Sequence, residues 1–119
     1  NEAEPTQLQV KNKQGVFWVK HNDIITIESG GNYVYIHAND QVLPMRSTMA
    51  KMEKQLHTRS FVRVHRSYLV NLGNCKGIHK QTPDTFELIL VNGKVVPISK
   101  KYRADLLKAL ELKNAESDV

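Results

Sequence analysis

The stretch that decides the fold is Phe61-Val62-Arg63-Val64-His65-Arg66-Ser67-Tyr68-Leu69-Val70-Asn71-Leu72. Its strand-forming apolar residues are interleaved with polar and cationic ones, namely Arg63, His65, Arg66, Ser67 and Asn71. Because regularly spaced apolar positions form the buried face of a strand, we interpret the stretch as strand-like and held in a small core. We expect its polar side chains to contact a partner, except Asn71, which we expect to bond backbone at a turn.

The charge around this stretch is one-sided. No Asp or Glu occurs between Lys54 and Pro83, and the whole chain has a net charge of +5 and a pI of about 9.4. The cations of this segment are Lys54, Arg59, Arg63, Arg66, Lys76 and Lys80, and its histidines are His57, His65 and His79. Solvated surfaces normally mix both signs, so this run predicts an anionic partner such as nucleic acid.

Composition limits the other classes of protein. With 119 residues, 40% of them hydrophobic and 24% charged, the chain fits one globular domain rather than a disordered or fibrous protein. No apolar run reaches the roughly 20 residues that span a bilayer, and no signal peptide opens the chain, so we expect a cytoplasmic domain without membrane contact. Cys75 is the single cysteine, and with His79 it supplies only two metal ligands, so neither a disulfide nor a metal site is predicted.

The two ends of the chain differ from its middle. Residues 1–7 are polar and contain Pro5, as inter-domain linkers often do, and residues 113–119 offer little to bury. We therefore expect a linker at 1–7, a folded domain at 8–112 and a disordered tail at 113–119. The linker-like start also predicts that the natural protein is longer than this chain.

Between these ends the periodicity is mostly that of β-strands. A turn-like tetrad at 12–15 separates two short apolar runs and predicts an opening hairpin, and Asn92-Gly93 predicts a second hairpin with a type I′ turn. Turn residues at 29–32, 38–40 and 81–84 delimit other strands. We expect these strands at 23–28, 33–37, 41–46, 77–78, 86–91 and 94–98.

Two helices are predicted. Ser47 is placed to cap a short mid-chain helix, in which Met49, Met52 and Leu56 fall on one face at spacings of three and four. Ser99 is placed to cap a C-terminal helix, and we expect the buried stripe of that helix to be Tyr102, Leu106, Leu107 and Leu110.

Three cations, Lys100, Lys101 and Arg103, occupy the first turn of the C-terminal helix. Positive charge at this position opposes the helix dipole by roughly 0.3–1 kcal/mol per residue. Such a cost is explained if the start of the helix faces phosphate. Simple solvation of the three side chains is the alternative interpretation.

The chain shows no catalytic signature. It lacks a phosphate-binding glycine loop, the metalloprotease and nucleophile-elbow motifs, and paired cysteines. His65 lies near Ser67, but a nucleophile and its base also need a third, orienting group, for which the sequence offers no candidate. We therefore expect a binding protein without a cofactor rather than an enzyme.

Five segments together resemble the LytTR DNA-binding domain, the output module of many bacterial response regulators. The resemblance covers nearly the full length of the chain, and the stretch 61–72 is its most specific part. The other segments are Asp23-Ile24-Ile25-Thr26-Ile27-Glu28, Asn32-Tyr33-Val34, Arg46-Ser47, and Asn92-Gly93 with Val96-Pro97-Ile98-Ser99-Lys100-Lys101-Tyr102.

The resemblance implies a mostly β, elongated, β-β-β sandwich-like fold with a short mid-chain helix and a C-terminal helix. In this family loops, rather than a recognition helix, enter successive major grooves of DNA, which departs from the common docking geometries. Carried onto the matching positions of this chain, the DNA-contacting residues are Asn32, Tyr33, His65, Arg66, Ser67, Lys100 and Lys101.

Chemistry suggests a role for each of these residues. The planar fork of Arg66 matches guanine O6 and N7, and Asn32 either recognises adenine or simply forms a turn. Lys100 is expected to reach a base or a phosphate. The matching position in the family often carries Arg, which can bind a base through two hydrogen bonds, whereas Lys cannot. The cations expected to contact phosphate, or to be only solvated, are Lys101, Arg103, Arg63, Lys76 and Arg46.

The partner implied is double-stranded DNA, bound in a sequence-specific manner to regulate transcription in a two-component phosphorelay. The resemblance also implies an upstream receiver domain, which this chain does not contain, and a dimer on DNA. Two alternatives remain open, a β-rich protein-interaction module and a single-stranded RNA-binding module. RNA binding on a sheet needs exposed aromatic residues, whereas the aromatics here are expected to be split between strand faces.

Overall fold

The computed structural model describes residues 7–56 and 60–117, with side chains through Leu110. Residues 1–6 of the expected linker, His57 and Arg59 of the acid-free segment, and residues 118–119 of the expected tail lie outside the described residues.

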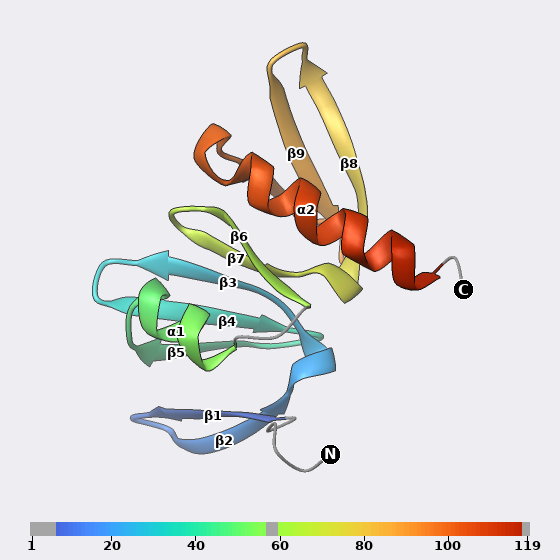
Figure 1. Ribbon diagram of the computed structural model, residues 1–119. Coiled ribbons are helices and arrows are strands. Elements are labelled where there is room, and N and C mark those ends of the chain that lie inside the picture. Colours follow the sequence, from blue (N-terminus) through green and yellow to red (C-terminus); the bar gives the residue numbers. More distant parts are fainter. Residues whose placement is uncertain (1–6, 57–59, 118–119) are drawn as a thin grey trace.

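Three β-sheets are stacked along the long axis of the molecule (Figure 1). The outermost sheet is a hairpin of β1 (Gln7–Asn12) and β2 (Gly15–Lys20), as predicted. The central sheet has the order β5-β4-β3-β7-β6, and the third has the order β10-β9-β8. The strands of the central sheet are β3 (Ile24–Gly30), β4 (Tyr33–Ala38), β5 (Val42–Arg46), β6 (Phe61–His65) and β7 (Tyr68–Asn71). Those of the third sheet are β8 (Cys75–Thr82), β9 (Thr85–Leu90) and β10 (Val95–Ile98). The mostly β, sandwich-like prediction is confirmed.

Two short 3₁₀ turns, η1 (His21–Asp23) and η2 (Leu72–Asn74), and two α-helices complete the described fold. Helix α1 (Met49–Gln55) buries Met49 and Met52, as the spacing predicted. Its cap is Thr48 rather than Ser47, because the backbone N–H of Lys51 donates to Thr48 Oγ1 at 3.2 Å. The expected cap was therefore wrong by one residue.

Helix α2 (Lys100–Ser117) lies across the third sheet and along β6 (Figure 1). Ser99 caps it as predicted, since its Oγ accepts from the N–H of Lys101 at 3.2 Å. Leu106 is buried, but Leu107 is 51% exposed, so the expected stripe was wrong at that position. The helix continues to Ser117, past the boundary at which we expected the domain to end.

The stretch 61–72 forms a β-hairpin rather than one continuous strand. Strands β6 and β7 pair antiparallel and are joined by the two-residue turn Arg66-Ser67. Phe61 and Leu69 enter the core between the central sheet, α1 and the β1–β2 hairpin. Val64 and Val70 enter the second core, under the third sheet and α2. This one hairpin therefore contributes to both cores.

Asn71, at the end of β7, holds the far end of the central sheet. Its Nδ2 donates to the carbonyl oxygens of His21 at 3.0 Å and Ile24 at 2.9 Å. Its Oδ1 accepts from the N–H of Gly73 at 3.0 Å. The expected structural role of Asn71 is confirmed, and the amide fixes η1 beside η2.

The β9–β10 connection differs from the type I′ turn that Asn92-Gly93 predicted. Leu90 and Lys94 face each other across a three-residue loop, because the N–H of Leu90 donates to the carbonyl of Lys94 at 2.9 Å. Only Gly93, at φ +88°, is left-handed, whereas a type I′ turn needs positive φ at both central residues. Asn92 instead accepts from the N–H of Lys94 through its side chain at 3.0 Å.

No helix within residues 7–56 and 60–117 combines the length and the apolar composition needed to cross a membrane.

Glu28 on β3 joins the central sheet to the β9–β10 loop. It accepts from the Tyr68 hydroxyl at 3.1 Å, bonds His37 Nε2 at 3.2 Å and lies 3.7 Å from Lys94 Nζ. Burial raises the pKa of the Tyr68 hydroxyl, and the neighbouring Glu28 raises it further. Burial lowers the pKa of His37, as does the charge of Lys94, and these two effects outweigh the opposite pull of Glu28.

We expect His37 to make stability depend on pH. Since its folded pKa lies below the ordinary value of 6.5, the unfolded chain binds this proton more readily. The stabilisation is thus complete above about pH 6.5 and is lost as the pH falls through the folded pKa. Urea unfolding of the wild type and of His37→Gln between pH 7.5 and 5 should show the wild type losing more stability. His79→Gln, at an exposed position, is the control, and equal pH slopes in wild type and His37→Gln would contradict the expectation.

Candidate nucleic-acid interface

Two turns and one helix start meet at the same edge of the molecule. The register of β3 with β4 and β7 places the turns Gly31-Asn32 and Arg66-Ser67 at one end of β3, and the N–H of Ser29 donates to the carbonyl of Ser67 at 2.9 Å. The N–H of Ser99 donates to the carbonyl of Val64 at 2.8 Å, which brings the start of α2 to the same edge. We call the segments 31–32, 66–67 and 99–101 the loop edge (Figure 1).

The β3–β4 turn presents Asn32 to solvent. Gly31 has φ +64°, a left-handed conformation that residues with a side chain rarely adopt, so it allows the tight turn. Asn32 is exposed and Tyr33 is 39% exposed beside it. Arg46, the register partner of Tyr33 on β5, is also exposed. The structure therefore brings these three predicted residues together.

The β6–β7 turn is held from inside the domain. His65 Nδ1 accepts from the N–H of Ser67 at 3.1 Å, and the His65 ring meets Tyr68 edge-on with centroids 5.6 Å apart. Within the described residues, His65 Nε2 and the Ser67 hydroxyl form no hydrogen bond. Arg66 is exposed at the tip.

Arg63 connects the loop edge to both helices. Its Nε donates to the carbonyl of His65 at 3.0 Å and its Nη2 to the carbonyl of Arg66, while Nη1 pairs with Glu53 of α1 at 2.9 Å. The guanidinium also lies 5.4 Å from the ring centroid of Tyr102 on α2. With 15% of its side chain exposed, Arg63 positions the Arg66-Ser67 turn; the sequence predicted a phosphate contact for this side chain, which these contacts do not test.

Arg103 and Lys76 also lie apart from the predicted cluster. Arg103 donates from Nη2 to the carbonyl of Asp84 at 2.6 Å and covers the Phe86 ring at 4.8 Å, so it attaches α2 to the β8–β9 hairpin. Lys76 is exposed near the start of β8, beside η2. That end of the sheet is opposite to the loop edge, since Asn74 of η2 donates to the carbonyl of Asn22 in η1. Lys100 and Lys101, in contrast, are exposed at the edge itself.

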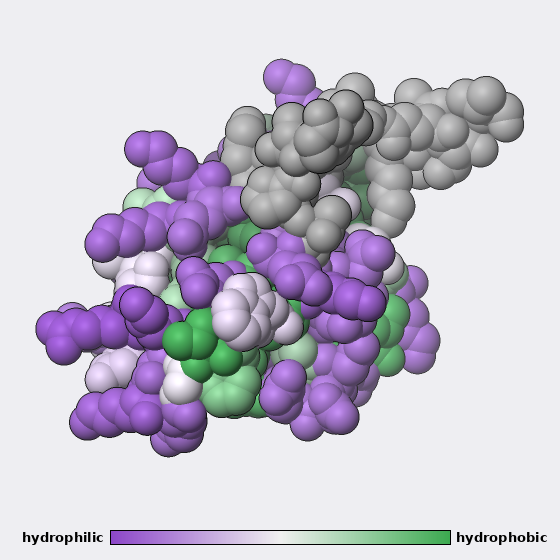
Figure 2. Space-filling view, turned by 90° about the horizontal axis from the view of Figure 1, so that it is seen from below, coloured by the Kyte–Doolittle hydropathy of each residue, from purple (hydrophilic) through white to green (hydrophobic). Residues whose placement is uncertain are grey.

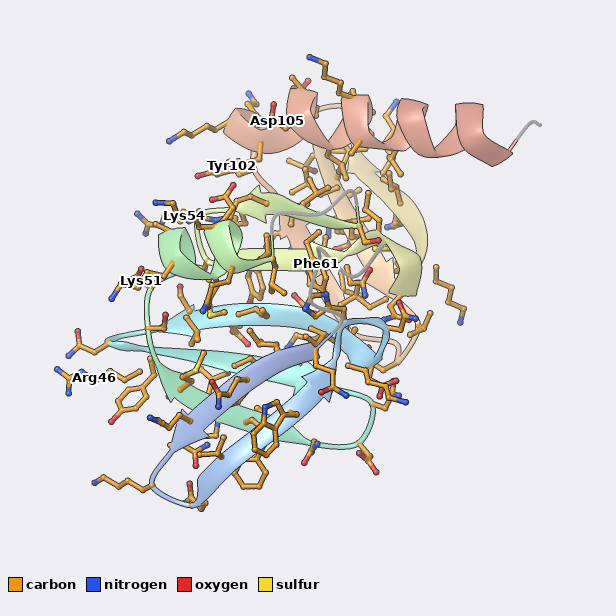
Figure 3. The ribbon with its side chains drawn as sticks, turned by 60° about the horizontal axis from the view of Figure 1, so that its bottom comes forward. Arg46, Lys51, Lys54, Phe61, Tyr102 and Asp105 are labelled. Carbon is orange, nitrogen blue, oxygen red and sulfur yellow. The ribbon has the colours of Figure 1, made fainter. Side chains whose placement is uncertain are left out.

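Helix α1 adds Lys51 and Lys54, neither of which was among the predicted DNA-contacting residues, although Lys54 belongs to the acid-free segment. Lys51 and Lys54 are exposed, and Figure 3 shows them in a row with Arg46 along the same side of the molecule. Lys51 and Arg46 line a hollow of about 320 Å³ that also contains Gly31, Asn32, Ser47, Thr48 and Met49. The helical spacing indicates the exposure of both lysines, because Lys51 and Lys54 must face outward if Met49 and Met52 face the core.

The charge of this edge is uncompensated within the described part of the chain. Glu53, the nearest acid on α1, is engaged by Arg63, and no other described acid pairs with the exposed cations. Figure 2 shows hydrophilic side chains projecting from the same side of the molecule. In residues 7–56 and 60–117 no group of three His, Cys, Asp or Glu side chains could hold a metal ion. The unpaired cations are Arg46, Lys51, Lys54, Arg66, Lys100 and Lys101.

Loops rich in hydrogen-bonding groups, surrounded by unpaired cations on a rigid sheet, define a nucleic-acid-binding β domain. The family model of the LytTr DNA-binding domain matches residues 14–111. The chain therefore belongs to the LytTR DNA-binding domain family.

Individual proteins agree with this assignment. The chain is 30% identical over 99 residues to the sensory transduction protein LytT of Bacillus subtilis, which covers 83% of this chain and 41% of LytT. It is 25% identical over 105 residues to the transcriptional regulatory protein LytR of Staphylococcus aureus, covering 88% of this chain and 43% of LytR. The chain thus spans less than half the length of these curated relatives.

A solved structure shares the fold. It is the LytTr DNA-binding domain of a putative methyl-accepting/DNA response regulator from Bacillus cereus, 28% identical, with a TM-score of 0.81. The match covers 89% of this chain and 97% of that one.

We expect Arg63→Lys to destabilise the domain by about 1–3 kcal/mol, because a lysine ammonium cannot bond two carbonyls and a carboxylate in the plane of the original fork. Arg66→Lys, at the exposed tip of the same turn, should change stability by less than about 0.5 kcal/mol. Urea unfolding of both variants measures this difference. Equal stability of the two variants would show that the contacts of Arg63 do not hold the turn.

Proposed function

We propose that this domain binds a specific double-stranded DNA sequence through its loop edge and thereby regulates transcription. The observation that supports this most is that the turns Gly31-Asn32 and Arg66-Ser67 lie at one end of β3, among cations that form no ion pair within the described residues. Side chains that can recognise bases are thus flanked by charges that can bind phosphate. Both are needed for specific recognition of DNA.

The roles follow from the groups that the fold leaves available. Arg66 presents a free fork and contacts guanine O6 and N7 in a major groove, while Asn32 contacts adenine N6 and N7. Ser67 is engaged through both its N–H and its carbonyl, so its hydroxyl is the ligand-facing group. His65 offers Nε2, and Tyr33 contacts the sugar-phosphate backbone beside Asn32.

The phosphate contacts come from the surrounding cations. Lys51 and Lys54 extend the predicted set of Arg46, Lys100 and Lys101, whereas Arg63, Arg103 and Lys76 take no direct part. About five such contacts give a log-log slope of affinity against salt of roughly −4 to −5.

The larger protein is a two-component response regulator of the bacterial cytoplasm, in which a phosphorylated receiver domain controls this output domain. This proposal is supported by relatives named as sensory transduction and transcriptional regulatory proteins, each more than twice as long as the matched region. Two domains occupy paired sites on DNA. Titration of a duplex with one or two copies of the selected site, followed by the mass of the complex, measures that stoichiometry.

One observation favours a second candidate, the binding of single-stranded RNA. Tyr33 and Tyr35 are 39% and 36% exposed and, two residues apart on β4, share one face of the sheet. Bases can stack on such a pair. Replacing both tyrosines by Leu abolishes binding if RNA is the ligand and only weakens it if DNA is.

Selection of bound duplexes from a random DNA pool, followed by a salt series with the winning duplex, tests the proposal. Arg66→Ala should relax preference at one base position by about 1–3 kcal/mol, whereas Lys101→Ala should weaken all duplexes alike and reduce the salt slope by about 1. A pool without an enriched sequence, together with an affinity that ignores salt, would sink the proposal and favour a protein-interaction module.

A further inference from the structure

A third turn lies on the same side of the molecule as the turns of the loop edge. Strands β1 and β2 pair from Gln7 opposite Lys20 to Asn12 opposite Gly15, so their turn is formed by Lys13 and Gln14. In Figure 1 this turn projects on the side where the β3–β4 turn and the start of α2 are found. None of the DNA contacts proposed above comes from this turn.

The turn borders a basic hollow. Lys11 and Lys13 line a depression of about 510 Å³ together with Arg46, Tyr33, Asn12, Gln14 and Pro44. Three of these seven side chains are cations and none is an acid. Lys11, Lys13 and Arg46 form no ion pair with any acid in residues 7–56 and 60–117, so their charge is available to a ligand.

The hollow is held in shape by Asn12. Its Nδ2 donates to the carbonyl of Pro44 on β5 at 2.9 Å, and its Oδ1 accepts from the N–H of Gln14 at 2.8 Å. One side chain thus fixes the turn internally and attaches it to the edge strand of the central sheet. Because the backbone on both sides is fixed, the main chain of Lys11 and Lys13 keeps its place relative to that of Arg46, and only the side chains need ordering on binding.

Arg46 links this hollow to the interface. The same side chain lines the hollow of Lys51 and Asn32 on one side and that of Lys11 and Lys13 on the other. A positive track therefore continues from α1 past the β3–β4 turn to the β1–β2 turn. A nucleic-acid backbone carries phosphates at regular intervals and matches such a track better than one isolated anion does.

We infer that Lys11 and Lys13 bind a backbone phosphate of the DNA, next to the bases that Asn32 contacts. The inference rests on the proposed function and extends it, since it adds a β1–β2 contact that positions the domain without specifying sequence. Lysine suits this role, because its ammonium is a point charge without the fork needed for base recognition.

The test compares two double variants with equal loss of charge. Lys11→Gln/Lys13→Gln removes the proposed contact, whereas Lys20→Gln/Lys76→Gln removes two exposed lysines near η1 and η2, at the opposite end of the domain. Both keep Asn12, and thermal unfolding checks that both remain folded. Affinity for the selected duplex is measured across a salt series, and phosphate-ethylation interference locates the contact.

For Lys11→Gln/Lys13→Gln we expect the salt slope to fall by about 1 to 2 and the affinity at 0.1 M salt to fall roughly 10- to 100-fold. At least one phosphate whose ethylation weakens the wild type should have no further effect on this variant. Lys11→Arg/Lys13→Arg should restore the slope. Lys20→Gln/Lys76→Gln should stay near the wild type.

Two failures are distinguishable. If the wild type binds a selected sequence but both double variants lose affinity equally, or the ethylation pattern is unchanged, the β1–β2 contact is wrong and the proposed function stands. If the wild type itself shows no selected sequence and no salt dependence, the proposed function fails first.

Discussion

The β6–β7 hairpin is shared by both hydrophobic cores, and the arrangement of the loop edge depends on this sharing. Phe61 and Leu69 are buried on one side of the central sheet, and Val64 and Val70 on the other. Burying one such side chain stabilises a fold by about 1.5–3 kcal/mol, so the hairpin cannot shift without loss in both layers. The Arg66-Ser67 turn therefore has a fixed position relative to the β3–β4 turn and to α2.

Polar contacts then fix the two ends of the hairpin that the hydrophobic cores hold in position. Arg63 joins the turn to Glu53 and Tyr102, and Asn71 fixes the opposite end of the same hairpin. Unpaired cations that crowd one edge repel one another, and this repulsion is a cost that the apolar layers must exceed. The domain keeps its charges free for a ligand because its stability comes from burial rather than from surface ion pairs.

Much of the fold could be predicted from the sequence, because apolar alternation and turn residues mark strands locally. The C-terminal cap at Ser99 and the structural role of Asn71 were predicted in this way. Other features of the site required three-dimensional information. The part of Arg63 depends on Glu53 and Tyr102, which are distant in sequence, and the separation of Lys76 from the edge depends on the β3–β7 register. The sequence identified the cations, but it could not show which of them form contacts within the fold. It also gave no sign that Lys51 lies beside Asn32.

In the proposed mode of binding, DNA contacts the loop edge rather than a sheet face. Amide chemical-shift changes in the ¹⁵N-labelled domain on addition of the selected duplex test it most directly. We expect the largest changes at Asn32, at Arg66-Ser67 and at Lys100-Lys101, with little change in η1 and η2 at the opposite end. Changes centred on Tyr35 and Val42 of the exposed sheet face, with the turns unaffected, would contradict it.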